Sequence, residues 1–427
     1  MWKIEQPLEN RNGVLHLGGV NLLKLAEKYG TPLFVTDEAR IRQNYRTIRN
    51  AFARRWNKFK IFYAVKANNN ISILNILRQE GAGADCSCVP ELQLASLSKF
   101  KMEDILYTGN YNSNDELKEA AQMGVTANLD DISILDRFAK FGLPESICFR
   151  INPGFGKGGF EKLVFAGPDA KFGITEEVAK KAYAKAKKLG VKKFGIHMMA
   201  GSSVLDADYF GQVTERLFQI GKSIAESVGI EFDFVNIGGG FGVPYKPGDE
   251  DLDIERVAQE VTERFKGQFE SSSNPPYLYA EPGRYLVCDS TVLLSRVHAV
   301  KFTGKKFVGI DAGMNILLRP ALYGAYHQMY VVNKLDVQKR EKVNVVGQVC
   351  ENSDILAKDR DLPFIEEGDL IAILNAGAYG YSMSSNYNTR PRAGELLLNN
   401  GEEFLIRERE DITDILDRQR IPGRLLK

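Results

Sequence analysis

This sequence has few cysteines, no long hydrophobic run and almost no net charge. Its five cysteines are irregularly spaced over 427 residues, so neither a disulfide framework nor a zinc site with paired Cys or His ligands is indicated. No stretch approaches the roughly 18 consecutive apolar residues of a transmembrane helix. The N-terminal segment MWKIEQPLENRNG lacks the apolar core of a secretory signal. We therefore expect a cytoplasmic protein.

The balance of charge argues against nucleic-acid and membrane partners. Lysine and arginine number 56 against 55 aspartates and glutamates, a formal net charge of +1 at pH 7. Such a chain carries no overall electrostatic footprint for DNA, RNA or an anionic bilayer. With 44% hydrophobic and 26% charged residues, the composition is that of a folded globular protein long enough for two domains. A small-molecule ligand is the first hypothesis.

Short apolar runs alternate with amphipathic stretches over the first two thirds of the chain. Residues 176–189 and 209–229 repeat apolar residues at spacings of three and four, which is typical of helices that bury one face. Nine runs have the length of strands: residues 34–36, 60–66, 83–88, 105–109, 125–129, 146–153, 193–199, 232–240 and 277–283. Roughly eight βα units predict a TIM-like (β/α)8 barrel, with an open doubly wound sheet as the alternative.

After Arg284 the pattern changes to closely spaced strands with few helical stretches. We therefore predict a barrel domain at residues 31–285 and a β-rich domain, a β-barrel or sandwich, at residues 286–427. Residues 1–30 include a segment, 13–20, that alternates like a strand. We expect these N-terminal residues to join the β-rich domain.

Polar residues at the ends of predicted barrel strands are the candidate site residues, because TIM barrels place their active sites at the carboxyl ends of their strands. Lys66 closes the run 60–66 among apolar and aromatic neighbours, which suits a Schiff-base nucleophile. The alternative is a strand-end lysine that reaches out to solvent.

Three later turns add anion-binding and acidic groups. Residues 236–242 read NIGGGFG, and such glycines let backbone N–H groups approach a phosphate. Residues 200–203 read AGSS, and Glu281 precedes Pro-Gly-Arg. Each feature alone is consistent with a tight turn or an ion pair. Together, a lysine, phosphate-binding turns and a carboxylate that can hold a protonated heterocyclic nitrogen indicate pyridoxal 5'-phosphate (PLP).

The ordered set of motifs resembles the fold-type III PLP-dependent decarboxylases, most closely those that act on diaminopimelate. The motifs are FYAVKANNN, GADCSCVPEL, RINPG, KFGI, NIGGGFGVPY, EPGRYLV, RPALYGAYH, CENSD and NAGAYGYSMSSNYNTRPR. The resemblance implies a PLP-binding TIM-like barrel and a C-terminal β-barrel domain. It also implies a homodimer whose active sites are shared between subunits.

The resemblance assigns roles to individual residues. Lys66 would hold PLP covalently and Glu281 would pair with its pyridine nitrogen. The other cofactor contacts would come from His197, Met199, Ser202, Gly239, Gly240, Gly283, Arg284 and Tyr379. The substrate would be bound by Arg284, Arg319, Tyr323, Glu351 and Tyr379, where arginines suit a second carboxylate and a glutamate suits a distal ammonium. Cys350 would return a proton to Cα, and Cys350 and Glu351 would come from the partner subunit. No metal is expected.

Two positions depart from the family pattern. Met199 stands where the family has a histidine that stacks on the PLP ring; a thioether can pack against an aromatic face, while ring electronics or substrate choice can differ. Asn375 stands where an aspartate is common. His197, two positions before Met199, is either a site residue or a core histidine with satisfied partners.

The implied reaction is the decarboxylation of meso-2,6-diaminopimelate to L-lysine and CO2, in lysine biosynthesis. The nearest alternative keeps the cofactor and acts on ornithine, lysine, arginine, carboxynorspermidine or a carrier-bound amino acid. A substrate without a distal carboxylate would leave two arginines unpaired, which favours diaminopimelate. A non-catalytic PLP carrier would resemble the barrel half alone, and the second acid–base tyrosine motif of a racemase is not evident.

Overall fold

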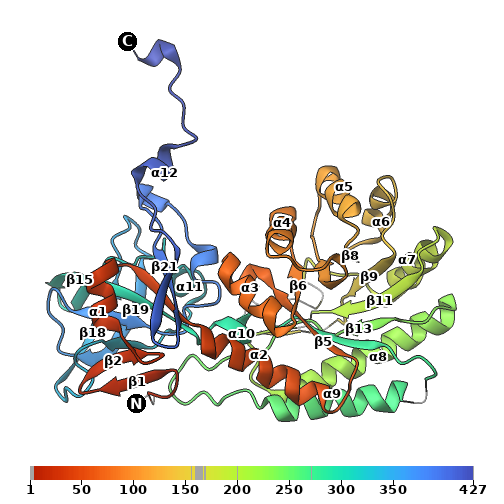
Figure 1. Cartoon of the computed structure of the whole chain (residues 1–427), viewed down its shortest axis with the longest axis horizontal. Helices are drawn as coiled ribbons and strands as arrows, with labels where there is room; N and C mark the ends of the chain where they lie inside the picture. The colour runs from red at the N-terminus through yellow and green to blue at the C-terminus, as the bar shows by residue number, and fades with distance from the viewer. Residues whose placement is uncertain are drawn as a thin grey trace. The chain divides into compact units, whose positions relative to one another are not determined.

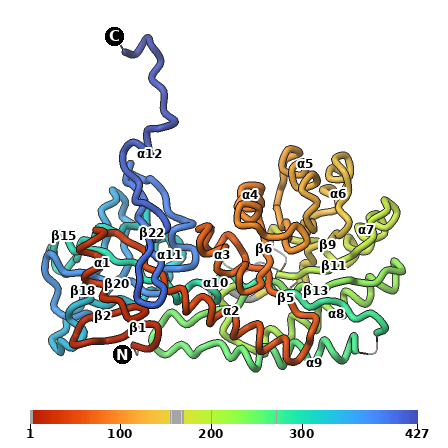
Figure 2. Tube along the Cα trace, viewed as in Figure 1, coloured from red at the N-terminus to blue at the C-terminus, as the bar shows by residue number. Residues whose placement is uncertain are grey.

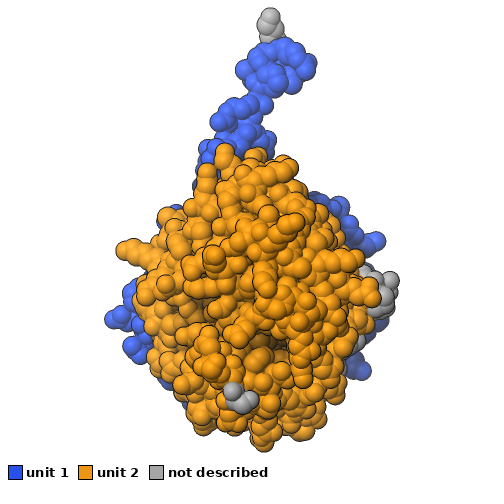
Figure 3. All heavy atoms as spheres, turned by 90° about the vertical axis from the view of Figure 1, so that its right-hand side faces the viewer, with its two compact units in different colours: residues 1–40, 245–248, 288–427 blue, residues 41–244, 249–287 orange. Residues whose placement is uncertain are grey.

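The computed structural model describes residues 4–154, 156–158, 167, 170–199, 201–270 and 272–426. The chain forms two compact units, shown in two colours in Figure 3. Unit 1 comprises residues 1–40, 245–248 and 288–427, and unit 2 comprises residues 41–244 and 249–287. Within the described ranges, no helix is both long and apolar enough to cross a membrane.

Unit 2 is built on a closed barrel of parallel strands (Figure 1). Its strands are β5 (Phe59–Ala64), β6 (Gly83–Cys86), β7 (Ile105–Tyr107), β8 (Thr126–Leu129), β9 (Ser146–Ile151), β11 (Lys193–Met198), β13 (Phe234–Asn236) and β14 (Tyr277–Ala280). They lie in the order β5-β6-β7-β8-β9-β11-β13-β14, and β14 pairs with β5 to close the barrel. These strands are almost continuously buried, as parallel strands covered on both faces should be. The predicted (β/α)8 barrel is confirmed.

Helices connect the barrel strands, and several of them begin at a residue whose side chain caps the first turn. They are α2 (Glu38–Ala53), α3 (Ile71–Glu80), α4 (Val89–Leu97), α5 (Asn114–Met123), α6 (Ile132–Phe138), α7 (Glu176–Lys188), α8 (Ala207–Val228), α9 (Ile254–Phe269) and α10 (Arg284–Val287). Ser113 and Glu116 form a capping box on α5, and Thr175 caps α7. The helices predicted at 176–189 and 209–229 are confirmed as α7 and α8. Two short strands, β10 (Lys157–Gly158) and β12 (Gly201–Ser202), pair in parallel.

Unit 1 is mainly β-structure, formed by both ends of the chain (Figure 2). Its large sheet contains β4 (Leu33–Asp37), β15 (Thr291–Phe302), β16 (Lys306–Ile310), β17 (Met329–Val331), β18 (Arg340–Val346), β19 (Ile355–Pro363), β20 (Leu370–Ile373), β21 (Gly394–Asn399) and β22 (Glu402–Arg407). A smaller sheet contains β1 (Leu8–Arg11), β2 (Val14–Leu17) and β3 (Val20–Asn21). The helices are α1 (Leu22–Tyr29), α11 (Arg319–Tyr323) and α12 (Ile412–Leu416).

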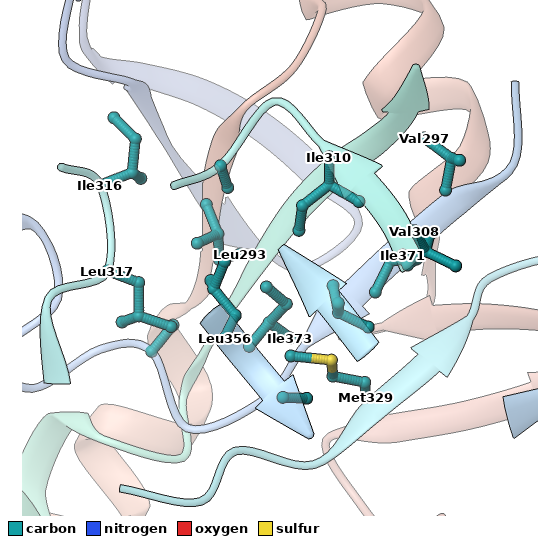
Figure 4. Packing of buried hydrophobic residues seen from close by; sticks show 14 of the residues in the cluster. Leu293, Val297, Val308, Ile310, Ile316, Leu317, Met329, Leu356, Ile371 and Ile373 are labelled. Carbon is teal, nitrogen blue, oxygen red and sulfur yellow. The ribbon is translucent and has the colours of Figure 1, made fainter. Parts of the chain in front are cut away.

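Two apolar clusters form the core of unit 1. One contains Leu293, Val308 and Ile373, whose side chains pack together in Figure 4. The other contains Leu17 and Leu294, among others. Alternating residues of a strand point to opposite faces, so successive residues of β15 supply both clusters.

The run at residues 34–36 was predicted to be a barrel strand, and this was wrong. It forms β4, which lies between β15 and β21 in the sheet of unit 1: Val35 is opposite Val292 in the antiparallel pair and Leu396 in the parallel pair. All five residues of β4 are buried. A strand buried on both faces gives the same apolar run in a barrel and in the centre of a covered sheet, so the sequence pattern does not distinguish them. The structure accordingly assigns residues 31–40, and also 245–248, to unit 1.

Candidate active site

Lys66 lies directly after β5, in a single turn of 3-10 helix at Val65–Ala67. Its Nζ donates a hydrogen bond to Oδ2 of Asp85, at the end of β6, over 2.8 Å. The lysine side chain is 43% exposed, whereas that of Asp85 is 1% exposed. The amine is therefore accessible to a ligand while its partner carboxylate is held in the interior.

Glu281, which follows β14, is bound at both carboxylate oxygens. Nδ2 of Asn236 donates to Oε1 over 2.6 Å, and Nε2 of His197 lies 3.1 Å from Oε2. Burial alone would raise the pKa of Glu281, but the charge and hydrogen bond of His197, the charge of Lys66 and the hydrogen bond of Asn236 together lower this pKa to about 2. Each carboxylate oxygen can accept a second bond, so an ionised Glu281 can also accept from a protonated ring nitrogen.

Asp85 is shifted in the opposite direction. Burial raises its pKa, the nearby charge of Glu281 raises it further, and the charge and hydrogen bond of Lys66 oppose the shift. A carboxylate with a raised pKa is a stronger base toward its hydrogen-bond donor. The site thus combines one carboxylate held ionised, Glu281, with a second, Asp85, whose pKa is raised and which accepts a hydrogen bond from the Lys66 amine.

The turn after β13 needs glycines because other backbone lies too close for side chains. A Cβ at Gly239 would lie 2.5 Å from the carbonyl oxygen of Glu281, and a Cβ at Gly240, whose φ is +99°, would lie 3.1 Å from that of Gly201. The carbonyl of Gly240 accepts from the N–H of Val204 over 2.9 Å. The two predicted phosphate-binding turns, at residues 200–203 and 236–242, therefore lie against each other. Ala200 falls outside the described residues.

Met199 contacts this glycine turn. Its Sδ accepts a hydrogen bond from the N–H of Gly239 over 3.2 Å. Ser202, three residues after Met199 and in β12, is partly exposed. Gly283 lies close to the segment that carries Lys66, since a Cβ there would lie 3.0 Å from that of Ala67. The predicted cofactor residues of unit 2 are thus all at the carboxyl ends of barrel strands or in the turns that follow them, a set of donors and close backbone turns that fits PLP.

Arg284, at the start of α10, also belongs to unit 2, and it is buried.

The remaining predicted residues belong to unit 1. Arg319 is fully buried: its Nη1 lies 3.0 Å from Nε2 of His327, and its guanidinium lies 4.6 Å from the ring centre of Tyr245. Its Nη2 has no hydrogen-bond partner in the described part of the chain. Tyr323 is four residues along the same short helix, α11, and so lies on the same side of it. A buried guanidinium with one unpaired nitrogen is suited to bind a carboxylate.

Cys350 and Glu351 are exposed in the loop between β18 and β19. The N–H of Cys350 donates to Oδ1 of Asn388 over 2.6 Å, which fixes the backbone at the cysteine. Tyr379 lies in the loop after β20 with a φ of +56°. Asn375, the lesser departure, is buried in the same loop with a φ of +57°.

Two residues that hold this site were assigned no role from the sequence. Asn236 ends β13 and orients Glu281, and Asp85 holds Lys66. The available signal was a polar residue within an otherwise buried strand run, which needs a partner when it is buried. His197 is also explained: it is buried against Glu281, although its Nδ1 has no hydrogen-bond partner among the residues described.

Known proteins share this sequence and fold. Residues 38–288 match the family model described as pyridoxal-dependent decarboxylase, pyridoxal binding domain. The chain is 44% identical over 421 residues to diaminopimelate decarboxylase of Methanothermobacter thermautotrophicus, a match covering 98% of each chain. It is 40% identical to that of Archaeoglobus fulgidus, covering 97% of this chain and 99% of the relative. The solved structure of diaminopimelate decarboxylase from M. jannaschii with L-lysine has a TM-score of 0.90, 33% identity and 98% coverage of both chains.

Proposed function

This chain belongs to the pyridoxal-dependent decarboxylase family, and its relatives are named diaminopimelate decarboxylase. We propose the following roles for its own residues in that reaction. The enzyme is a carboxy-lyase that converts meso-2,6-diaminopimelate to L-lysine and CO2 with PLP. The observation that carries the residue assignment is the group at the carboxyl ends of β5, β6, β11 and β14: an accessible lysine on a buried carboxylate beside an ionised glutamate.

PLP, when bound, withdraws electrons from Cα of the substrate and thereby weakens its bond to the carboxylate. Lys66 would hold the cofactor covalently, and Asp85, which accepts a hydrogen bond from the Lys66 amine, would orient that amine. Glu281 keeps the ring nitrogen protonated, and its low pKa means that it stays ionised throughout the physiological range.

The remaining cofactor residues hold the phosphate and the ring. We assign the phosphate to Ser202, Gly239 and Gly240, to the backbone of Gly283, and to the hydroxyl of Tyr379. Met199 packs against the ring in place of the histidine of the family, and Arg284 lines the same region. His197 acts on the cofactor through Glu281, the group it contacts.

Substrate recognition falls to Arg284, Arg319, Tyr323, Glu351 and Tyr379. The unpaired Nη2 of Arg319 supports a carboxylate ligand, because leaving a buried donor unpaired costs about 1–3 kcal/mol. Diaminopimelate supplies that second carboxylate and ornithine does not. Glu351 binds the distal ammonium, and the thiol of Cys350 returns a proton to Cα.

We further assign Cys350 and Glu351 to the partner subunit of a homodimer, as the sequence resemblance implies. We also place the protein in a reducing compartment, the cytoplasm, which is supported by five cysteines that form no disulfide with one another.

The first test measures the visible absorbance of bound PLP together with CO2 release from meso-diaminopimelate, L-lysine, D-ornithine and carboxynorspermidine. Wild type should turn over meso-diaminopimelate alone. Lys66→Ala should lose the absorbance band and at least about 100-fold in kcat, whereas Lys101→Ala, at a lysine 76% exposed, should behave as wild type. Turnover of another substrate, or a retained band in Lys66→Ala, would contradict the assignment.

A second test addresses the shared sites. Lys66→Ala and Cys350→Ala subunits, each inactive as homodimers, are mixed and allowed to exchange. Half of the dimers then contain one subunit of each variant, and each of these heterodimers has one intact site out of two. About a quarter of wild-type activity should therefore return. If each site used its own Cys350, no activity would return.

A further inference from the structure

The last segment of unit 1, residues 411–426, has no packing partner in its own unit. It follows β22 and contains α12 and a 3-10 turn at Gly423–Leu425, and Figure 1 shows it extending away from the strands of unit 1. Every residue in it except Ile415 is exposed. Among the described residues, each hydrogen bond of the segment has both partners inside it, such as Gln419 N–H to the carbonyl of Leu416.

A helix this short does not persist in water without tertiary contacts. α12 has five residues and a capping box at Asp411, but isolated helices shorter than about 12–15 residues are marginal. Ile412 and Leu416, one turn apart on the same side of α12, are 52% and 46% exposed. Ile421 and Leu425 follow at 66% and 58% exposed. Burying these apolar side chains against another surface would stabilise the segment.

The charges of the segment indicate which surface would bury its apolar side chains. Its acidic residues, Asp411, Asp414 and Asp417, all come before its basic residues, Arg418, Arg420 and Arg424. If two copies align antiparallel about a two-fold axis, the acidic half of each lies against the basic half of the other. The contact is then self-complementary, as a two-fold interface requires. The local ion pair Asp417–Arg418 does not compete strongly, because both side chains are largely exposed.

We propose that residues 411–426 form a dimerisation arm that pairs antiparallel with the same segment of a second copy of this chain. The pairing buries Ile412 and Leu416 of one copy against Ile421 and Leu425 of the other. This contact is separate from the catalytic assignment above and does not depend on it.

The test is a charge swap with partner choice as its readout. One full-length variant carries Arg418→Glu, Arg420→Glu and Arg424→Glu, and the other carries Asp411→Lys, Asp414→Lys and Asp417→Lys. The two are co-expressed, and native mass spectrometry measures mixed and like dimers. Random pairing would make half of the dimers heterodimers of the two variants. The ratio of heterodimers to homodimers should rise about threefold or more above this value, because arms of the same variant repel each other and arms of different variants attract.

The control reverses charges at exposed acids elsewhere: Glu250→Lys, Asp251→Lys and Glu367→Lys, co-expressed with the arginine-swapped variant. It should leave mixed dimers at the statistical fraction. A chain carrying both swaps should dimerise like wild type, and deleting 411–427 should weaken dimerisation. A heterodimer fraction of one half for the two charge-swapped variants, or the absence of dimers, would overturn the proposal. Unchanged decarboxylase activity in the charge-swapped variants would show that they are folded.

Discussion

Two buried carboxylates at the carboxyl end of the barrel differ in ionisation because their neighbours differ. Glu281 faces His197 and Asn236, which outweigh its burial and lower its pKa. Asp85 has Lys66 as its cationic partner, and burial outweighs it and raises the pKa of Asp85. One carboxylate is therefore held ionised and the other has a raised pKa, although both lie at the carboxyl ends of barrel strands.

Glu281→Gln tests the first of these roles through pH. The folded protein favours the ionised form, so Glu281 contributes stability that is fully present above pH about 5 and is lost as pH falls through about 2. In the cofactor-free protein, the variant should have a free energy of unfolding about 1–3 kcal/mol below wild type near pH 7, and the difference should shrink on acidification. Urea unfolding at a series of pH values measures it. Glu103→Gln, at an exposed glutamate, is the control; a difference that does not vary with pH would refute the role.

Met199 is the main departure that the resemblance implies, because a ring-stacking histidine is expected at this position. Met199→His restores a ring-stacking side chain and releases the N–H of Gly239 for the phosphate. Stacking contributes about 0.5–1.5 kcal/mol, so the Kd for PLP should fall about 2- to 12-fold. Spectroscopic titration of the cofactor-free protein measures this. Met199→Leu separates the two effects, because it also releases the N–H but adds no ring, and equal affinities for the two variants would exclude a stacking gain.

Among the elements, the turns after β11 and β13, to which we assign the phosphate of the cofactor, approach each other closely. They lie so close together that carbonyl oxygens occupy the space of possible side chains at Gly239 and Gly240. Within the turn after β13, the N–H of Gly238 donates to Oδ1 of Asn236 and the N–H of Gly239 donates to Sδ of Met199. A phosphate site formed in this way is rigid and intolerant of any added atom.

Gly239→Ala should therefore disrupt cofactor binding. Its Cβ would lie 2.5 Å from the carbonyl oxygen of Glu281, so the turn must shift, at a cost of about 1–3 kcal/mol. The Kd for PLP should rise about 5- to 150-fold. Gly267→Ala is the matched control, because this exposed position in α9 has nothing within 4 Å of the added Cβ and should gain up to about 1 kcal/mol of stability. An unchanged Kd in Gly239→Ala would show that the turn adapts.

At the level of the whole molecule, the β-rich unit needs both ends of the chain. β4 occupies the space between β15 and β21, and its side chains enter both apolar clusters: Phe34 in one and Leu33 and Val35 in the other. Without β4, β15 and β21 would each expose an edge of unpaired backbone groups and uncovered apolar side chains. The C-terminal strands alone are not a complete domain.

The fragment 288–427 should consequently be unfolded or aggregated when produced alone. The same fragment fused after residues 4–40 through a flexible glycine-serine linker should regain a folded sheet, because β4 then fills its place. Circular dichroism and amide dispersion in NMR spectra measure the difference. A second fusion with Val35→Asp, which places a charge in the core, should remain unfolded. A folded 288–427 fragment would mean that β4 is dispensable.

The sequence alone determined the barrel, the cofactor and the identity of the strand-end residues, because these depend on local patterns. An apolar run that ends in a lysine or in consecutive glycines specifies a strand and its turn within a few residues, as for Lys66 and Gly239. It did not identify β19 or β22, where charged residues interrupt the apolar pattern. Only the tertiary structure showed that β4 belongs to unit 1, that Asp85 holds Lys66, and that Asn236 and His197 hold Glu281. Hydrophobic periodicity reports that a residue is buried, but the partner that buries it is set by pairing between segments distant in the chain.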